Sequence, residues 1–134
     1  MNHSSRRNAR KNAIQALYSW QISKNSIYEI EKYFFLENKL LYTDIAYFRF
    51  LFYEVSKNTD KLDTIMKPYV SRSIKNIDFI EKNILRIAIF EFMQKKIPYK
   101  IVINEAIELA KIFGSEKSYA FINGVLDKIH LILK

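Results

Sequence analysis

Only two glycines and two prolines interrupt the 134 residues of this chain. Folds built from strands need frequent turns, and glycine and proline make many of those turns, so this scarcity disfavours sandwiches and barrels. Apolar residues recur at helical spacing instead: Ile45, Phe48, Phe52 and Val55 share one helix face. The sequence therefore predicts an all-α protein, and its length predicts a single domain over residues 1–134.

Residues that start or stop helices divide the chain into segments. Ser26 followed by Glu29 forms a capping box, and Asp78 followed by Glu81 has the same pattern. Thr43 and Asp44 can cap the helix between them. Pro68 cannot continue the helix that precedes it. The segment that Asp78 opens is apolar around most of its circumference, so we expect a buried central helix there. The expected helices cover residues 5–25, 26–33 or 26–35, 43–55, 60–68, 78–95, 98–114 and 115–133, with one or two helical turns at 71–77.

Five residues at helix ends or within helices carry separate expectations. Asp60 is expected to start the short fourth helix, and Ser115 or Ser118 to open the last one. Gly114 is expected as a left-handed cap. Gly124 lies in the middle of the last helix, where glycine lowers helix stability, so we expect it to let another helix approach closely.

The charge balance bounds the possible partners. The chain has 22 lysines and arginines against 14 acids, a net charge of +8. A basic protein is attracted to polyanions, either nucleic acid or anionic lipid, and charge alone does not choose between them. The absence of cysteine excludes disulfides and thiolate metal sites. With no secretory signal and no apolar run of roughly 20 residues, we expect a soluble cytoplasmic protein without a membrane partner.

Residues that could carry out catalysis are scarce. His3 and His130 have no second histidine at metal-ligand spacing. Glu105 and Glu108 are three residues apart, which fits a solvated helix face with one partly buried acid better than a catalytic pair. No glycine-rich phosphate loop is present. We therefore expect a binding protein that is not an enzyme and uses no metal or cofactor.

The basic start of the chain is the most informative surface. The first expected helix has an apolar stripe made of Ala9, Ala13, Ala16, Leu17 and Trp20. Arg6, Arg7, Arg10 and Lys11 cover an arc of roughly 140° on a helical wheel, bordering that stripe. Tyr18 projects from the same side. Arginines that pair with phosphate, followed by a ring that stacks on a base, suit single-stranded RNA. A solvated basic helix start is the alternative, although cations there oppose the helix dipole.

Several short motifs, in order along nearly the whole chain, match a known pattern. Residues 104–111 read N-E-A-I-E-L-A-K, and residues 121–127 read F-I-N-G-V-L-D. Further matching stretches are R-R-N-A-R at 6–10, I-Q-A-L-Y-S-W-Q at 14–21, M-K-P-Y-V-S-R at 66–72, E-K-N-I-L-R-I-A at 81–88 and I-P-Y-K at 97–100. Together they resemble the NusB family of bacterial transcription antitermination proteins.

This resemblance implies a fold of about seven helices in two packed bundles, with the arginine-rich first helix exposed. It also implies binding to boxA RNA of ribosomal RNA operons together with NusE, a small-subunit ribosomal protein, so that RNA polymerase reads through terminators. The residues that match the family's RNA-binding positions are Arg6, Arg7, Arg10 and Phe121. The residues that match positions facing NusE are Tyr18 and Glu81, and we expect Glu81 to remain accessible at the start of the central helix.

The chain departs from the family pattern at three positions. Asn8 stands where a basic residue is frequent, which lowers the expected RNA affinity. Ala120 stands where lysine or arginine is common, and Lys117 stands where acidic or polar residues are common. A lysine at 117 can compensate for the missing basic residue at 120, so we add Lys117 to the expected RNA-binding set. Lys11, which follows Arg10 in the first helix, also belongs to this set.

Other interpretations of the same residues remain open. Phe121 can belong to the core, because Val125 lies on its face, and Glu81 can serve only in its capping box. A similar helical domain precedes the catalytic domain of some ribosomal RNA cytosine methyltransferases, but this chain has no cofactor loop and no cysteine. A helical adaptor whose charge serves only solubility is the second alternative, and salt dependence of RNA binding distinguishes it.

Overall fold

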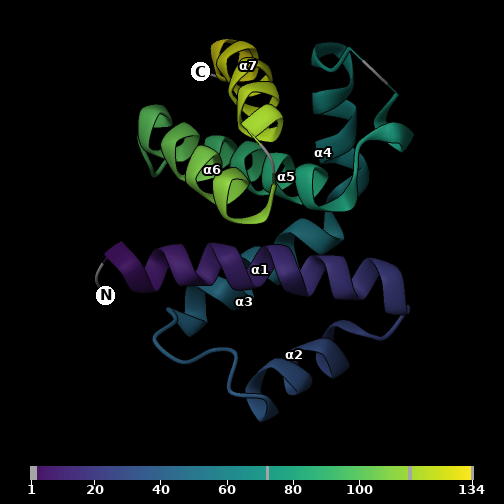
Figure 1. The fold of residues 1–134 in the computed structure, drawn as a ribbon, viewed down its shortest axis with the longest axis vertical. Helices are drawn as coiled ribbons and strands as arrows, with labels where there is room; N and C mark the ends of the chain where they lie inside the picture. Colours follow the sequence, from purple (N-terminus) through teal and green to yellow (C-terminus); the bar gives the residue numbers. More distant parts are fainter. Residues whose placement is uncertain (1–2, 72, 115, 134) are drawn as a thin grey trace. The chain divides into compact units, whose positions relative to one another are not determined.

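The computed structural model describes residues 3–71, 73–114 and 116–133, and these contain seven α-helices and no strand. The predicted all-α class is thereby confirmed. Figure 1 shows their order along the chain. The helices are α1 (His3–Ser23), α2 (Ile27–Leu36), α3 (Ile45–Lys57), α4 (Thr59–Met66), α5 (Phe79–Gln94), α6 (Tyr99–Phe113) and α7 (Glu116–Ile132), with short 3₁₀ turns η1 (Lys67–Tyr69) and η2 (Ile74–Asn76).

Three helix starts are capped by the expected side chains. The Ser26 hydroxyl accepts from the amide of Glu29, whose carboxylate accepts from the amide of Ser26, so this capping box is confirmed. Asp44 caps α3 by accepting from the amide of Tyr47 at 3.1 Å. Asp78 caps α5 in the same way. Each cap satisfies an amide that would otherwise lack a partner at the first turn.

Both glycine predictions are wrong. Gly114 has φ −126° and is extended, so it is not a left-handed cap. A Cβ at this position would lie 2.7 Å from the Ser118 hydroxyl, so glycine is needed for space. A Cβ at Gly124 would meet no atom of the described residues within 4 Å, so among them no other helix of the second unit approaches closely there. The left-handed cap instead follows α5, at Lys95 with φ 57°.

Two predicted helix starts also differ from the structure. Asp60 is the second residue of α4, and the cap position before the helix is Asn58, which makes no side-chain cap bond. Ser118 lies inside α7, two residues after its start, and Ser115 lies outside the described residues. The expected turns at 71–77 reduce to the single turn η2.

The chain divides into two compact units, residues 1–57 and 58–134. In the first unit, α1 packs against α2 and α3, and a loop after α2 returns to the start of α1 (Figure 1). The stripe of α1 predicted to be apolar is fully buried at its alanines and leucine: Ala9, Ala13, Ala16 and Leu17. Phe34 stacks on Phe48 with their centroids 5.9 Å apart.

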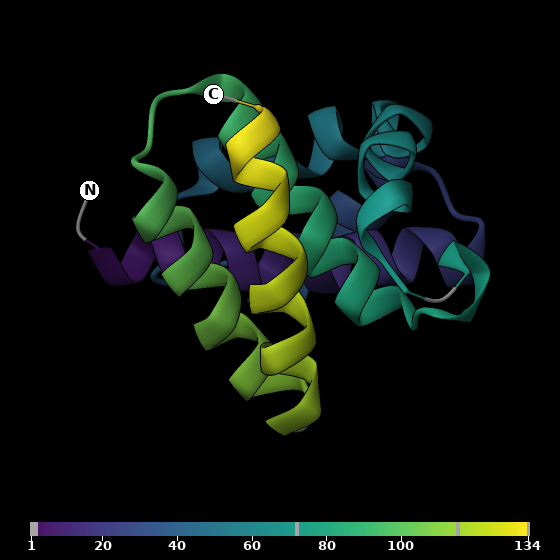
Figure 2. The ribbon, with the colours of Figure 1, turned by 90° about the horizontal axis from the view of Figure 1, so that it is seen from above.

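The second unit is built around α5, which packs against α4, α6 and α7. Figure 2 shows α6 and α7 running side by side, and these two helices share the most extensive contact in the unit. Every residue from Glu81 to Phe92 is buried, which confirms the predicted central helix. No helix in the described part of the chain is both long and apolar enough to cross a membrane.

Candidate nucleic-acid interface

The start of α1 gathers two guanidinium groups on one ring. The guanidinium carbon of Arg6 lies 3.9 Å from the centroid of the Tyr47 ring, and that of Arg10 lies 5.6 Å from the same centroid. A planar guanidinium is attracted to the negative face of an aromatic ring. Tyr47 comes from α3 and was not singled out in the sequence. The Tyr47 ring therefore contacts two arginines of the first turns of α1.

The four basic residues of this helix differ in exposure. Arg6, Arg7 and Lys11 are partly exposed. Arg10 is only 3% exposed, so the expectation of an exposed arginine-rich helix is wrong at this position. The reason is its place beside the apolar stripe, which turns it toward the interior. Arg10 contributes charge to this end of α1 with little accessible surface.

Arg6 is also tied to the loop that precedes α3. Its Nε lies 3.3 Å from Oδ2 of Asp44, a carboxylate that is almost fully buried. The backbone amide of Asp44 donates to the carbonyl of Ser5 at 3.0 Å. Asp44 therefore caps α3 and fixes the direction of Arg6.

Two asparagines of α1 continue this attachment along the loop. The Asn8 side-chain amide donates to the carbonyl oxygen of Tyr42 at 3.0 Å. The Asn12 side-chain amide donates to the Thr43 hydroxyl at 3.1 Å, and this pair is buried. The segment 42–44 is thus held at each of its three residues by α1.

The remaining expected RNA-binding residues lie on α7. Lys117 is exposed, and Phe121, one helical turn later, is partly exposed. Ala120, which precedes Phe121, is also exposed. These residues belong to the second unit, whereas the arginines belong to the first.

The two residues expected to face NusE are placed differently. Tyr18 is 41% exposed on α1, in agreement with its predicted position off the apolar stripe. Glu81 is the third residue of α5 and its amide donates to Asp78 at 2.8 Å. Its side chain is 7% exposed, so the expectation that it stays accessible at the helix end is wrong.

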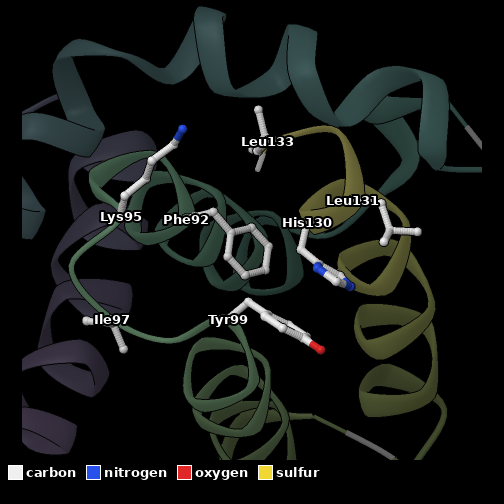
Figure 3. A pocket seen from close by; sticks show the side chains of 7 residues that line it. All are labelled: Phe92, Lys95, Ile97, Tyr99, His130, Leu131 and Leu133. Atoms are coloured by element: carbon white, nitrogen blue, oxygen red, sulfur yellow. The ribbon is translucent and has the colours of Figure 1, made fainter.

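A hollow of about 430 Å³ lies in the second unit, where α5 and α7 end and α6 begins. Figure 3 shows the rings of Tyr99 and His130 lying face to face, with Phe92 beside them. The Tyr99 and His130 centroids are 4.1 Å apart and their planes differ by 4°. No sequence pattern had indicated this hollow. Among the described residues, no three histidine or carboxylate side chains gather as a metal site.

An all-helical chain with guanidinium groups and rings gathered on one helix start defines a class of non-covalent binding protein suited to an anionic partner. The model of the NusB family matches residues 7–131. The transcription antitermination protein NusB of Pasteurella multocida is 52% identical over 97% of this chain and 91% of its own length. That of Escherichia fergusonii is 49% identical over all of this chain and 97% of its own length. The chain belongs to the NusB family, as its motifs had indicated.

Solved structures agree with this assignment. The crystal structure of antitermination factors NusB and NusE in complex with dsRNA contains a chain that is 26% identical, with a TM-score of 0.84. The match covers 98% of this chain and 99% of that one. The solution structure of NusB from Aquifex aeolicus has a TM-score of 0.78 at 25% identity, over 95% of this chain and 88% of that one.

Proposed function

We propose that this protein is a transcription antitermination factor that binds boxA-type RNA together with NusE and helps RNA polymerase read through terminators. It acts in the cytoplasm, where nascent RNA and ribosomal proteins meet. The observation that carries the proposal is the start of α1, where Arg6 and Arg10 converge on Tyr47. Support comes from the similar solved structure, which holds NusB and NusE with dsRNA.

Arg6, Arg7 and Lys11 are the residues we assign to RNA phosphates. All three are partly exposed, and a guanidinium presents several N–H donors in one plane that match phosphate oxygens. Arg10 adds its charge from beneath this surface. The exposed ammonium of Lys117 is a further phosphate contact in this proposal, and Phe121 packs against a base.

Tyr18 and Glu81 are the residues we assign to NusE. An exposed tyrosine buries a large ring area when a partner covers it, and tyrosine is enriched among the residues that dominate interface energies. Tyr18 fits this role. Glu81 offers a partner only a small exposed part of its side chain, so its share of the interface is smaller.

Salt dependence of RNA binding tests the proposal. The affinity for boxA-type single-stranded RNA should be measured with and without NusE at several salt concentrations. Arg7→Ala should flatten the plot of log affinity against log salt by up to about 0.7, the value for one phosphate contact to a single strand. Lys61→Ala on α4 removes the same charge from an exposed position outside the assigned set and should leave the slope unchanged. If the parent protein binds no such RNA under either condition, the proposal fails.

A further inference from the structure

Tyr42 stands out from every other described large apolar side chain by its exposure, which reaches 86%. Its backbone adopts φ 57°, the left-handed region that favours glycine and asparagine over tyrosine. A tyrosine here combines an unfavourable backbone with a ring left in water. Neither feature contributes to folding.

The position of Tyr42 is nevertheless fixed by the basic helix. Asn8 holds its carbonyl oxygen at 3.0 Å, and Asn12 holds the next residue, Thr43, at 3.1 Å. The amide of Asp44 is bound to the carbonyl of Ser5. The backbone of the segment is therefore anchored to α1 while the Tyr42 ring remains uncovered.

The segment that carries this ring contacts the basic helix α1. Asn8 lies on α1 between Arg7 and Arg10, and no acid precedes Glu29 in the chain. The nearest carboxylate in the loop, Asp44, is paired with Arg6. An exposed ring on a segment bound to the arginine-bearing helix matches single-stranded RNA, in which bases alternate with phosphates.

We propose that Tyr42 stacks on a base of the bound RNA and that Asn8 is the residue that positions it. This inference rests on the proposed function and adds a base contact to its phosphate contacts. In the sequence, Asn8 was notable only because it stands where a basic residue is frequent in the family. In the structure it donates the hydrogen bond that holds the Tyr42 backbone on α1.

The first test compares variants that keep or remove the ring, with boxA-type single-stranded RNA as the probe and NusE present. Tyr42→Ala should weaken binding about 5- to 150-fold, the range for losing one stacked base, while the salt slope stays that of the parent. Tyr42→Phe should retain the affinity. Tyr28→Ala removes another exposed ring, from α2, and should leave RNA binding unchanged.

The role of Asn8 is tested by combining substitutions. Asn8→Ala should weaken RNA binding with an unchanged salt slope, because it removes no charge. In the background of Tyr42→Ala, the same substitution should have almost no further effect, because the ring that it positions is absent. Full additivity of the two losses would overturn the positioning role.

Fluorescence gives a direct readout of stacking. Trp20 is the only tryptophan, so Trp20→Phe with Tyr42→Trp places a single indole in the loop. Its emission should be quenched on addition of single-stranded RNA and unaffected by NusE alone.

If Tyr42→Ala leaves RNA affinity unchanged while Arg7→Ala flattens the salt slope, the stacking inference is overturned and the proposed function stands. If Tyr42→Ala weakens NusE binding in the absence of RNA, Tyr42 is a protein contact and the stacking inference is likewise overturned.

Discussion

The guanidinium of Arg86 donates two hydrogen bonds to the carboxylate of Asp63, from Nε to Oδ1 at 2.8 Å and from Nη2 to Oδ2 at 2.7 Å. Nη1 of the same group donates to the Asn83 side chain at 3.2 Å. The Arg86 side chain is only 6% exposed, so its charge is separated from water. This paired geometry offsets the desolvation of the guanidinium and joins α5 to α4.

Asp63→Asn should therefore lower the free energy of unfolding substantially. It leaves the Arg86 charge buried without its carboxylate, a situation that costs about 3 kcal/mol. The measurement is urea denaturation followed by circular dichroism. Glu54→Gln breaks the exposed pair with Lys57 and should cost less than about 1 kcal/mol. Equal losses in the two variants would contradict a special role for the Arg86 pair.

Lys82 carries a second buried charge of α5. Burial lowers the pKa of Lys82 below its ordinary 10.5, the Arg86 charge lowers the pKa further, and the Asp63 charge partly opposes both effects. Between the lowered pKa of the folded state and 10.5, the unfolded chain binds more protons at this lysine. The contribution of Lys82 to the free energy of unfolding therefore rises as pH rises through that window.

Lys82→Met should be at least as stable as the parent at pH 7, because it removes the desolvated charge. Its advantage should shrink as the pH rises from the lowered pKa toward 10.5. Urea denaturation at a series of pH values checks this difference. Lys61→Met, on the exposed face of α4, should show no such trend. An advantage of Lys82→Met that grows with pH would contradict the direction of the pKa shift.

Three helix starts could be predicted because a cap and its helix are neighbours in the sequence. Ser26, Asp44 and Asp78 each accept from an amide three residues later, and all three starts were predicted. The role of Gly114 was not, because the space that it provides is set by Ser118 only after the chain packs. A helix cap depends on residues that are neighbours in the sequence, whereas packing contacts depend on the folded chain.

The same distinction applies to the candidate site. The arginines of α1 all lie within residues 6–10, so the positive charge of this segment was evident from the sequence. Tyr47 and Tyr42 reach that stretch from α3 and the loop before it, more than 30 residues away along the chain. No local pattern marks a ring that will meet a distant cation. Likewise, the burial of Arg10 follows from contacts that its sequence neighbours do not reveal.

Tyr53→Phe tests a polar cluster within the first unit. The Tyr53 hydroxyl donates to Oε1 of Glu31 at 3.0 Å, and Nε of Arg49 lies 2.7 Å from Oε2. Removing the hydroxyl takes one donor from a buried carboxylate and should cost about 1–3 kcal/mol in thermal or urea unfolding. Tyr33→Phe, at an exposed position of α2, should cost within about 0.5 kcal/mol. A neutral Tyr53→Phe would mean that Arg49 alone satisfies Glu31.

The partner surface is best tested at Tyr18. Its exposed ring lies on α1, so Tyr18→Ala should leave folding nearly unchanged while removing an anchor for NusE. The loss expected for such an anchor is about 2 kcal/mol, or roughly 30-fold in Kd by titration calorimetry without RNA. Tyr33→Ala truncates a similarly exposed ring on α2 and should bind NusE like the parent. The thermal midpoint of each isolated variant controls for folding. A Tyr18→Ala protein that folds normally and binds NusE with parental affinity would place the NusE interface elsewhere, whatever the effect of substitutions at Glu81.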